Sequence, residues 1–94
     1  MAGKATDWID GARKQREIEF EPKYGPIRPR TDPRCFRREM IEELLDALNY
    51  CEWAFKKGEL NRAQRGLIDR TTRATIRTIE AACSDKFEWE TNWL

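Results

Sequence analysis

The fold is decided by residues 37 to 64, which read RREMIEELLDALNYCEWAFKKGELNRAQ. Apolar side chains recur there every three or four residues as far as Phe55, which is the spacing of one face of an α-helix. Gly58 follows two lysines and predicts the end of that helix, because glycine accepts a left-handed backbone and positive charge suits the carbonyl end. Asn61 and Gln64 stand at the two positions of a capping box, which predicts a second helix. Because so short a link implies antiparallel neighbours, the stretch predicts a two-helix hairpin.

The hairpin is expected to cover residues 33–84. Asp32 and Pro33 predict its start. An Asp side chain can accept hydrogen bonds from the free amides of the first turn, and Pro at the first helical position gives up no helical hydrogen bond. The second helix is expected from Asn61 to about Cys83. The predicted core face of the first helix consists of Phe36, Met40, Ile41, Leu44, Leu45, Ala47, Leu48, Cys51 and Phe55.

The second predicted helix has a packing stripe of small side chains. Such a stripe would let the first helix or a second subunit approach closely, and Gly66 near its edge fits the same picture. Two helices alone bury too little to be stable, so arms must cover them or chains must pair. The stripe consists of Ala63, Leu67, Thr71, Ala74 and Thr78, flanked by Ile68, Thr75 and Ile79.

Extended arms are expected on both sides of the hairpin. In the N-terminal arm, residues 1–32, the segment Glu17–Glu21 alternates polar and apolar as a strand does, and the prolines from Pro22 onward disfavour helix. Residues 85–94 form an aromatic C-terminal tail that alternates in the same way. The predicted fold class is therefore mainly α: an antiparallel two-helix hairpin with extended N- and C-terminal arms, room for one short strand pair, and an oligomeric state.

Composition argues against several classes of protein. The chain has 94 residues, which support one small domain, and 37% of them are charged. No run of about 18 apolar residues and no apolar signal segment is present, so we expect a cytoplasmic protein with no membrane partner. The absence of His and the wide spacing of Cys35, Cys51 and Cys83 argue against a disulfide framework, a zinc site or a Cys-His nucleophile. The thiols are expected to be buried or half-buried.

The first predicted helix carries a row of carboxylates. Their spacing of three and four places them on one side of the helix, and such a row suits a hard divalent cation such as Mg²⁺. At 100° per residue, however, the row centres nearly opposite the apolar face of its own helix. Solvation, metal binding and contact with a partner all stay open for it. The row consists of Glu39, Glu42, Glu43 and Asp46.

Two aromatic residues, Tyr50 and Trp53, lie on the acidic side of the same helix. A solvated face seldom needs large aromatics in its middle. The combination of acid and aromatic groups suggests either a second packing surface, covered by one of the arms, or a contact site for a basic partner.

The segment EELLDALNY, residues 42–50, resembles one helix of the all-alpha, MazG-like nucleoside triphosphate pyrophosphohydrolases, in which an ExxD step helps to hold magnesium. The resemblance implies that Glu43 and Asp46 are this step, with Glu39 and Glu42 as further magnesium ligands in an enzyme that acts as an oligomer. Those enzymes carry an ExxE step on an earlier helix. In this chain the earlier region holds Glu17, Glu19 and Glu21 at strand spacing, so the second motif is missing.

The second predicted helix carries an arginine row on the face away from its apolar stripe. Arginine forks bind phosphates and carboxylates, so the row could hold nucleic acid or an acidic protein surface. A net charge of +1 and the absence of a recognised nucleic-acid module weigh against nucleic acid. The acidic row of a neighbouring chain is a further candidate. The row consists of Arg62, Arg70, Arg73 and Arg77.

These features favour a small non-enzymatic interaction protein, with no catalytic residue assigned and no cofactor except magnesium in the enzyme alternative. In size and texture the chain is similar to small helical proteins of bacteriophages and mobile elements, which implies binding to a host or viral protein assembly. The expected contact residues are Glu39, Glu42, Glu43, Asp46, Tyr50 and Trp53 on one helix and Arg62, Arg70, Arg73 and Arg77 on the other.

Overall fold

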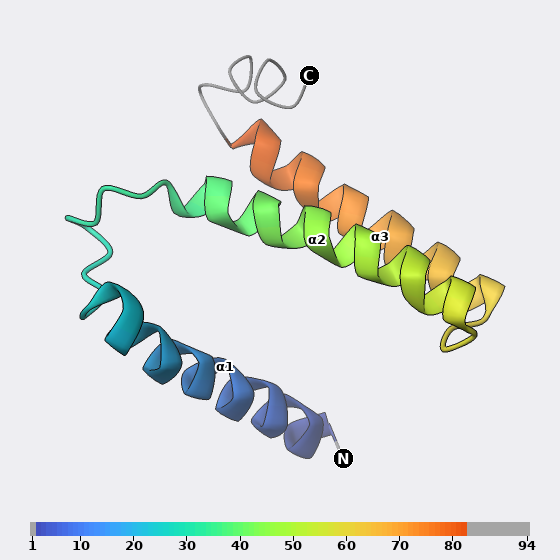
Figure 1. The fold of residues 1–94 in the computed structure, drawn as a ribbon, viewed down its shortest axis with the longest axis horizontal. Coiled ribbons are helices and arrows are strands. Elements are labelled where there is room, and N and C mark those ends of the chain that lie inside the picture. Colours follow the sequence, from blue (N-terminus) through green and yellow to red (C-terminus); the bar gives the residue numbers. More distant parts are fainter. Residues whose placement is uncertain (1, 83–94) are drawn as a thin grey trace. The chain divides into compact units, whose positions relative to one another are not determined.

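The computed structural model describes the backbone of residues 2–82 and the side chains of residues 8–23 and 25–82. This part of the chain contains three helices and no strand: α1 is Ala2–Tyr24, α2 is Phe36–Lys57 and α3 is Arg62–Ala81 (Figure 1). The prediction of a mainly α protein is confirmed. The chain divides into two units, Met1–Pro33 and Arg34–Leu94, which are described separately below.

The prediction of an extended N-terminal arm is wrong, because α1 occupies most of it. The segment Glu17–Glu21 is helical, and Pro22 lies inside the helix, two residues before its end. Charged and alanine residues with good helix propensity outweigh two alternating apolar positions, and a proline in the last turn affects few hydrogen bonds. Gly25 ends the helix with φ 75°, and its N–H donates to Glu21 O at 2.7 Å. All side chains described in α1 are exposed.

The start of α2 also differs from the prediction at Asp32 and Pro33. The helix begins at Phe36, and Cys35 is its N-cap residue, with no side-chain capping bond. Asp32 belongs to the preceding turn, because its N–H donates to Arg28 O at 3.0 Å. Asp32 thus lies three residues before the N-cap residue and is not in the capping position.

The link between α2 and α3 follows the local sequence signals. Gly58 adopts φ 90° at the end of α2, where its N–H donates to Phe55 O and the next amide, that of Glu59, donates to Ala54 O. Asn61 and Gln64 form the predicted capping box: each side chain accepts a hydrogen bond from the other's backbone N–H, at 2.8 and 2.9 Å.

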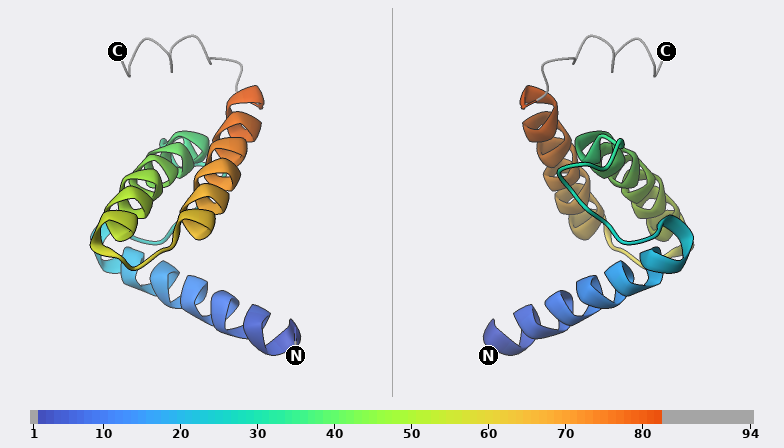
Figure 2. Two further views of the ribbon diagram at one scale, coloured as in Figure 1. Left: turned by 90° about the vertical axis from the view of Figure 1, so that its right-hand side faces the viewer. Right: turned by 90° about the vertical axis from the view of Figure 1, so that its left-hand side faces the viewer.

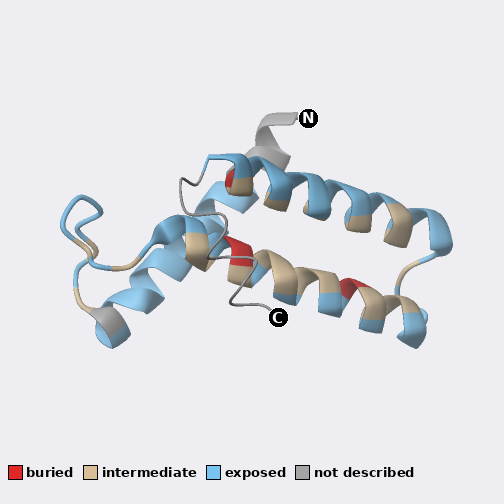
Figure 3. Ribbon diagram, turned by 90° about the horizontal axis from the view of Figure 1, so that it is seen from above, coloured by how far each residue is buried: buried red, intermediate tan, exposed pale blue. Residues whose placement is uncertain are grey.

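The α2 and α3 helices lie side by side, and their contacts pair the start of one with the end of the other (Figures 1 and 2). Ile41 near the start of α2 packs on Ile79 near the end of α3; their exposed fractions are 4% and 9%. At the opposite end of the pair, Cys51 Sγ donates to Arg65 O at 3.7 Å. The edges that face one another carry the buried and half-buried residues (Figure 3). Leu44, Leu45 and Ile76 pack against this small core.

On α2, the predicted core face is largely correct. Ile41 and Cys51 are buried, and most of the other apolar positions are half-buried, but Phe36 and Met40 are exposed at the start of the helix. We call the face toward α3 the inner face of α2. It consists of Ile41, Leu44, Leu45, Leu48, Cys51 and Phe55.

On α3, the packing stripe predicted from the sequence is not the face that contacts α2. The larger aliphatic side chains Ile76 and Ile79 turn toward α2 instead, because they bury more apolar surface than Ala and Thr do. The threonine hydroxyls of the stripe donate hydrogen bonds to backbone carbonyls of their own helix. Thr71 Oγ1, for example, donates to Leu67 O at 2.9 Å. Ala63, Leu67, Thr71, Ala74 and Thr78 are all exposed.

The predicted C-terminal tail, its strand pairing and Cys83 lie outside the described residues. Within residues 2–82, no helix combines the length and the apolar content that a membrane crossing requires.

Candidate functional site

The outer face of α2, directly away from α3, holds every acidic and aromatic contact residue predicted for this helix. Glu43 and Asp46 are exposed, and Glu39 and Glu42 are partly exposed. Apart from the adjacent pair Glu42 and Glu43, successive members are three or four residues apart, so the helix itself sets their alignment. We call this surface the acidic–aromatic face. It consists of Glu39, Glu42, Glu43, Asp46, Tyr50 and Trp53.

The two aromatic rings of the acidic–aromatic face contact each other. Tyr50 and Trp53 are 66% and 58% exposed, with ring centroids 5.5 Å apart and planes at 87°, an edge-to-face arrangement. An edge-to-face contact restricts both side chains, so they present a large apolar surface with little freedom left to lose on binding.

The carboxylates of the acidic–aromatic face have no ion-pair partner among the described residues. Three acidic groups on other faces of α2 and α3 differ from them: Glu52, Asp69 and Glu80 each accept a bond from an arginine at 2.9 to 3.1 Å. The face therefore carries four formal negative charges that no described side chain of the protein neutralises.

The arginine row of α3 is exposed along its whole length, but its members differ in their partners. Arg73 Nε lies 2.9 Å from Asp69 Oδ2, and Arg77 Nη1 lies 2.9 Å from Glu80 Oε1, both within the helix. Arg62 and Arg70 have no ion-pair partner among the described residues. The structure does not bring the row to the acidic–aromatic face of the same chain, because that face points away from α3.

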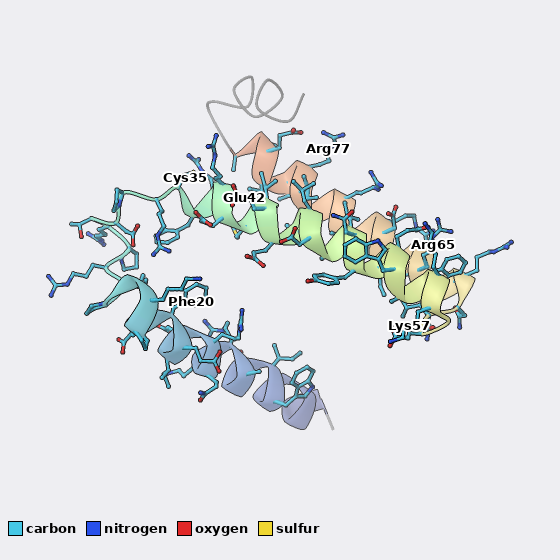
Figure 4. All side chains as sticks on the ribbon, viewed as in Figure 1. Phe20, Cys35, Glu42, Lys57, Arg65 and Arg77 are labelled. Atoms are coloured by element: carbon cyan, nitrogen blue, oxygen red, sulfur yellow. The ribbon has the colours of Figure 1, made fainter. Side chains whose placement is uncertain are left out.

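Sequence reasoning missed a polar cluster at the end of the α2–α3 pair. Arg65 Nε lies 3.1 Å from Glu52 Oε2, and its guanidinium carbon lies 4.7 Å from the centre of the Phe55 ring. Arg65 and Lys57 lie at this end and Cys35 and Arg77 toward the other (Figure 4). The signal was an acidic residue, Glu52, within the apolar arc of its helix. The cluster joins α2 to α3 through two partly exposed side chains.

The first residue before α2, Cys35, was also misjudged, since its thiol is exposed rather than half-buried. The backbone amide of Arg38, close to the sulfur, lowers the pKa of the thiol, and the nearby Arg37 with its positive charge lowers it further. Cys51 is buried, as predicted.

The residues of the magnesium alternative stay together on one helix. Among the described residues, no group of three or more His, Cys, Asp or Glu side chains is placed to hold a metal ion. Because α1 is a helix, Glu17 and Glu21 are one turn apart on it, at a spacing of four where an ExxE step has three. Glu43 and Asp46 keep the spacing of the ExxD step.

Comparison of the chain with protein-family models, with characterised proteins and with solved structures found no match. The acidic–aromatic face of α2 and the arginine row of α3 are therefore the features from which a function is inferred.

Proposed function

We propose that this protein is a small non-enzymatic interaction protein whose acidic–aromatic face binds a basic surface of a protein partner. The observation that carries the proposal is the exposed, edge-to-face pair of Tyr50 and Trp53 beside carboxylates that have no ion-pair partner in the described part of the chain. Tyr and Trp dominate the energetics of protein interfaces, and unpaired charges of one sign speed association with a surface of the opposite sign.

The layout of the face suits a partner helix or strand that lies along α2. The carboxylates occupy the first half of the helix and the aromatic pair the second half. A partner with arginine or lysine at one end of its contact and an apolar or guanidinium group at the other would satisfy both parts. The chain's likeness to small phage proteins supports a host or viral assembly as the source of that partner.

Photo-crosslinking from position 53 tests the proposal. The full chain, with benzoylphenylalanine in place of Trp53, is irradiated in cells that naturally encode it, and adducts are identified by mass spectrometry. We expect a covalent protein adduct that disappears when Glu43 and Asp46 are both replaced by Arg. Trp8, exposed on α1, provides a matched control position.

The proposal fails if position 53 yields no adduct beyond the background of position 8. It also fails if the adduct survives the double charge reversal, because the carboxylates would then play no part in recognition.

A further inference from the structure

We propose that the partner held by the acidic–aromatic face is the arginine row of a second copy of this chain. The inference rests on the proposed function and names its partner. Both surfaces are largely exposed, and each has members without an ion pair within residues 8–82. Inside one chain they do not meet, because the acidic–aromatic face points away from α3. A second copy supplies the opposite charge to each.

The spacing of the two rows matches when the helices run in opposite directions. The carboxylates span residues 39–46 and three arginines span residues 70–77, so both segments cover about two helical turns. With Arg77 of one copy facing Glu39 of the other, Arg70 faces Asp46. Each turn of the acidic segment then meets a guanidinium.

The same register continues into the aromatic half of the face. Tyr50 of one copy then faces Gly66 of the other, and Trp53 lies beside Arg62, whose guanidinium can stack on the indole. Gly66 lies in the middle of the arginine row, and a Cβ built on it would meet only the Arg70 guanidinium, at 3.4 Å, among the described residues. In this register the Arg70 guanidinium turns from Gly66 to Asp46 of the other copy, and the bare backbone at this turn then leaves room for the Tyr50 ring.

The contact is heterologous, because it joins two different surfaces. After the first contact one copy keeps a free arginine row and the other keeps a free acidic–aromatic face, so further copies can add. Such contacts generate a ring when the rotation closes and a filament when it does not. Self-association through this contact is strongest at low salt, since the pairs lie at the surface.

Sedimentation velocity of the full chain tests the inference through two charge-reversed variants. One carries Glu43→Arg and Asp46→Arg, the other Arg62→Glu and Arg70→Glu; all four positions are exposed, so circular dichroism should stay unchanged. We expect wild type to associate at low salt and each variant alone to associate at least about 30-fold more weakly, because like charges then face one another. Mixing the two variants restores association, because each provides the complement of the other.

A matched control replaces Arg13 and Arg16 of α1 by Glu, which changes the net charge as the Arg62→Glu, Arg70→Glu variant does and leaves both rows intact. This control should associate as wild type does. The inference is overturned if wild type stays monomeric at low salt, if either variant associates unchanged, or if the mixture gains nothing. If any of these three results is found and position 53 still crosslinks to a different protein, the second copy is not the partner but the proposed function stands. If position 53 crosslinks to no protein, the proposed function and the second copy as its partner are both wrong.

The register has its own test in Gly66→Gln. The substitution improves helix propensity, so the monomer should melt no lower than wild type, yet the added side chain fills the space across from Tyr50 and should weaken association several-fold. Unchanged association contradicts the register.

Discussion

The two faces of α2 belong to the same 22-residue helix but differ in burial and in the pairing of their charges. The inner face buries Ile41 and Cys51 against α3, and Glu52 beside it is paired with Arg65. The outer face leaves two large aromatic rings in solvent and its carboxylates without partners among the described residues. The inner face therefore stabilises the pair of helices, whereas the apolar and charged groups of the outer face remain available for a contact outside the fold.

The largest effect is expected on the inner face, from Ile41→Ala. Ile41 is the most buried apolar side chain described, so its truncation leaves a cavity against Ile79 and should lower the free energy of unfolding by about 2–5 kcal/mol. Urea unfolding followed by circular dichroism measures the change. Met40→Ala, one residue away but exposed, should cost under about 1 kcal/mol. Equal losses at the two positions would contradict the assignment of the inner face.

A smaller effect is expected at the polar end of the inner face, from Arg65→Met. The variant loses the ion pair with Glu52, and because both side chains are 40% exposed, solvent screening limits the loss to about 0.5–1 kcal/mol. A double-mutant cycle with Glu52→Gln measures the coupling. Arg73→Met, which breaks an exposed pair within α3, is the control and should cost less than Arg65→Met. A coupling of zero would show that the cluster does not hold the helices together.

At the start of α2, outside both faces, Cys35 gives a prediction for pH. The amide of Arg38, with help from Arg37, lowers the pKa of this thiol, so Cys35 should react with iodoacetamide at a lower pH than an ordinary thiol. Because the folded pKa lies below the unfolded one, the thiolate contributes stability above the unfolded pKa and loses it as pH falls through the folded pKa. Arg37→Gln should move the alkylation midpoint upward.

The alkylation is read in a Cys83→Ser background, where the buried Cys51 should stay unreactive until the chain unfolds. An unchanged midpoint in Arg37→Gln would contradict the role of Arg37 at this thiol.

The features predicted best are those set by a few neighbouring residues. Gly58 and the pair Asn61 and Gln64 act through their own backbone, so the sequence alone places the end of α2 and the start of α3. The outer face follows from the same logic, since the spacing of its residues on one helix fixes which side they share. Whether Tyr50 and Trp53 would be covered by other parts of the chain was open in the sequence; among the described residues they are exposed.

The features predicted wrongly depend on contacts across the chain or on weak local signals. The rotation of α3 is set by Ile41, Glu52 and the hydrogen bond from Arg37 Nη1 to Ala82 O at 2.8 Å, all of which involve α2. The pattern of Ala and Thr along α3 contains no information about these contacts with α2, so it could not predict which side of α3 faces α2. In α1, two alternating apolar residues and a proline near the end were given more weight than the helix propensity of the remaining residues.

The claim that the two rings of the outer face of α2 are not part of the folded core is tested by the free energy of unfolding of a variant with both Tyr50→Ala and Trp53→Ala, measured on the dilute chain. If the outer face of α2 is a contact surface that folding does not use, removing both rings should change the free energy by less than about 0.5 kcal/mol, the range of ordinary surface substitutions. A loss approaching that of Ile41→Ala would contradict the account, because the rings would then belong to the packed interior of the protein.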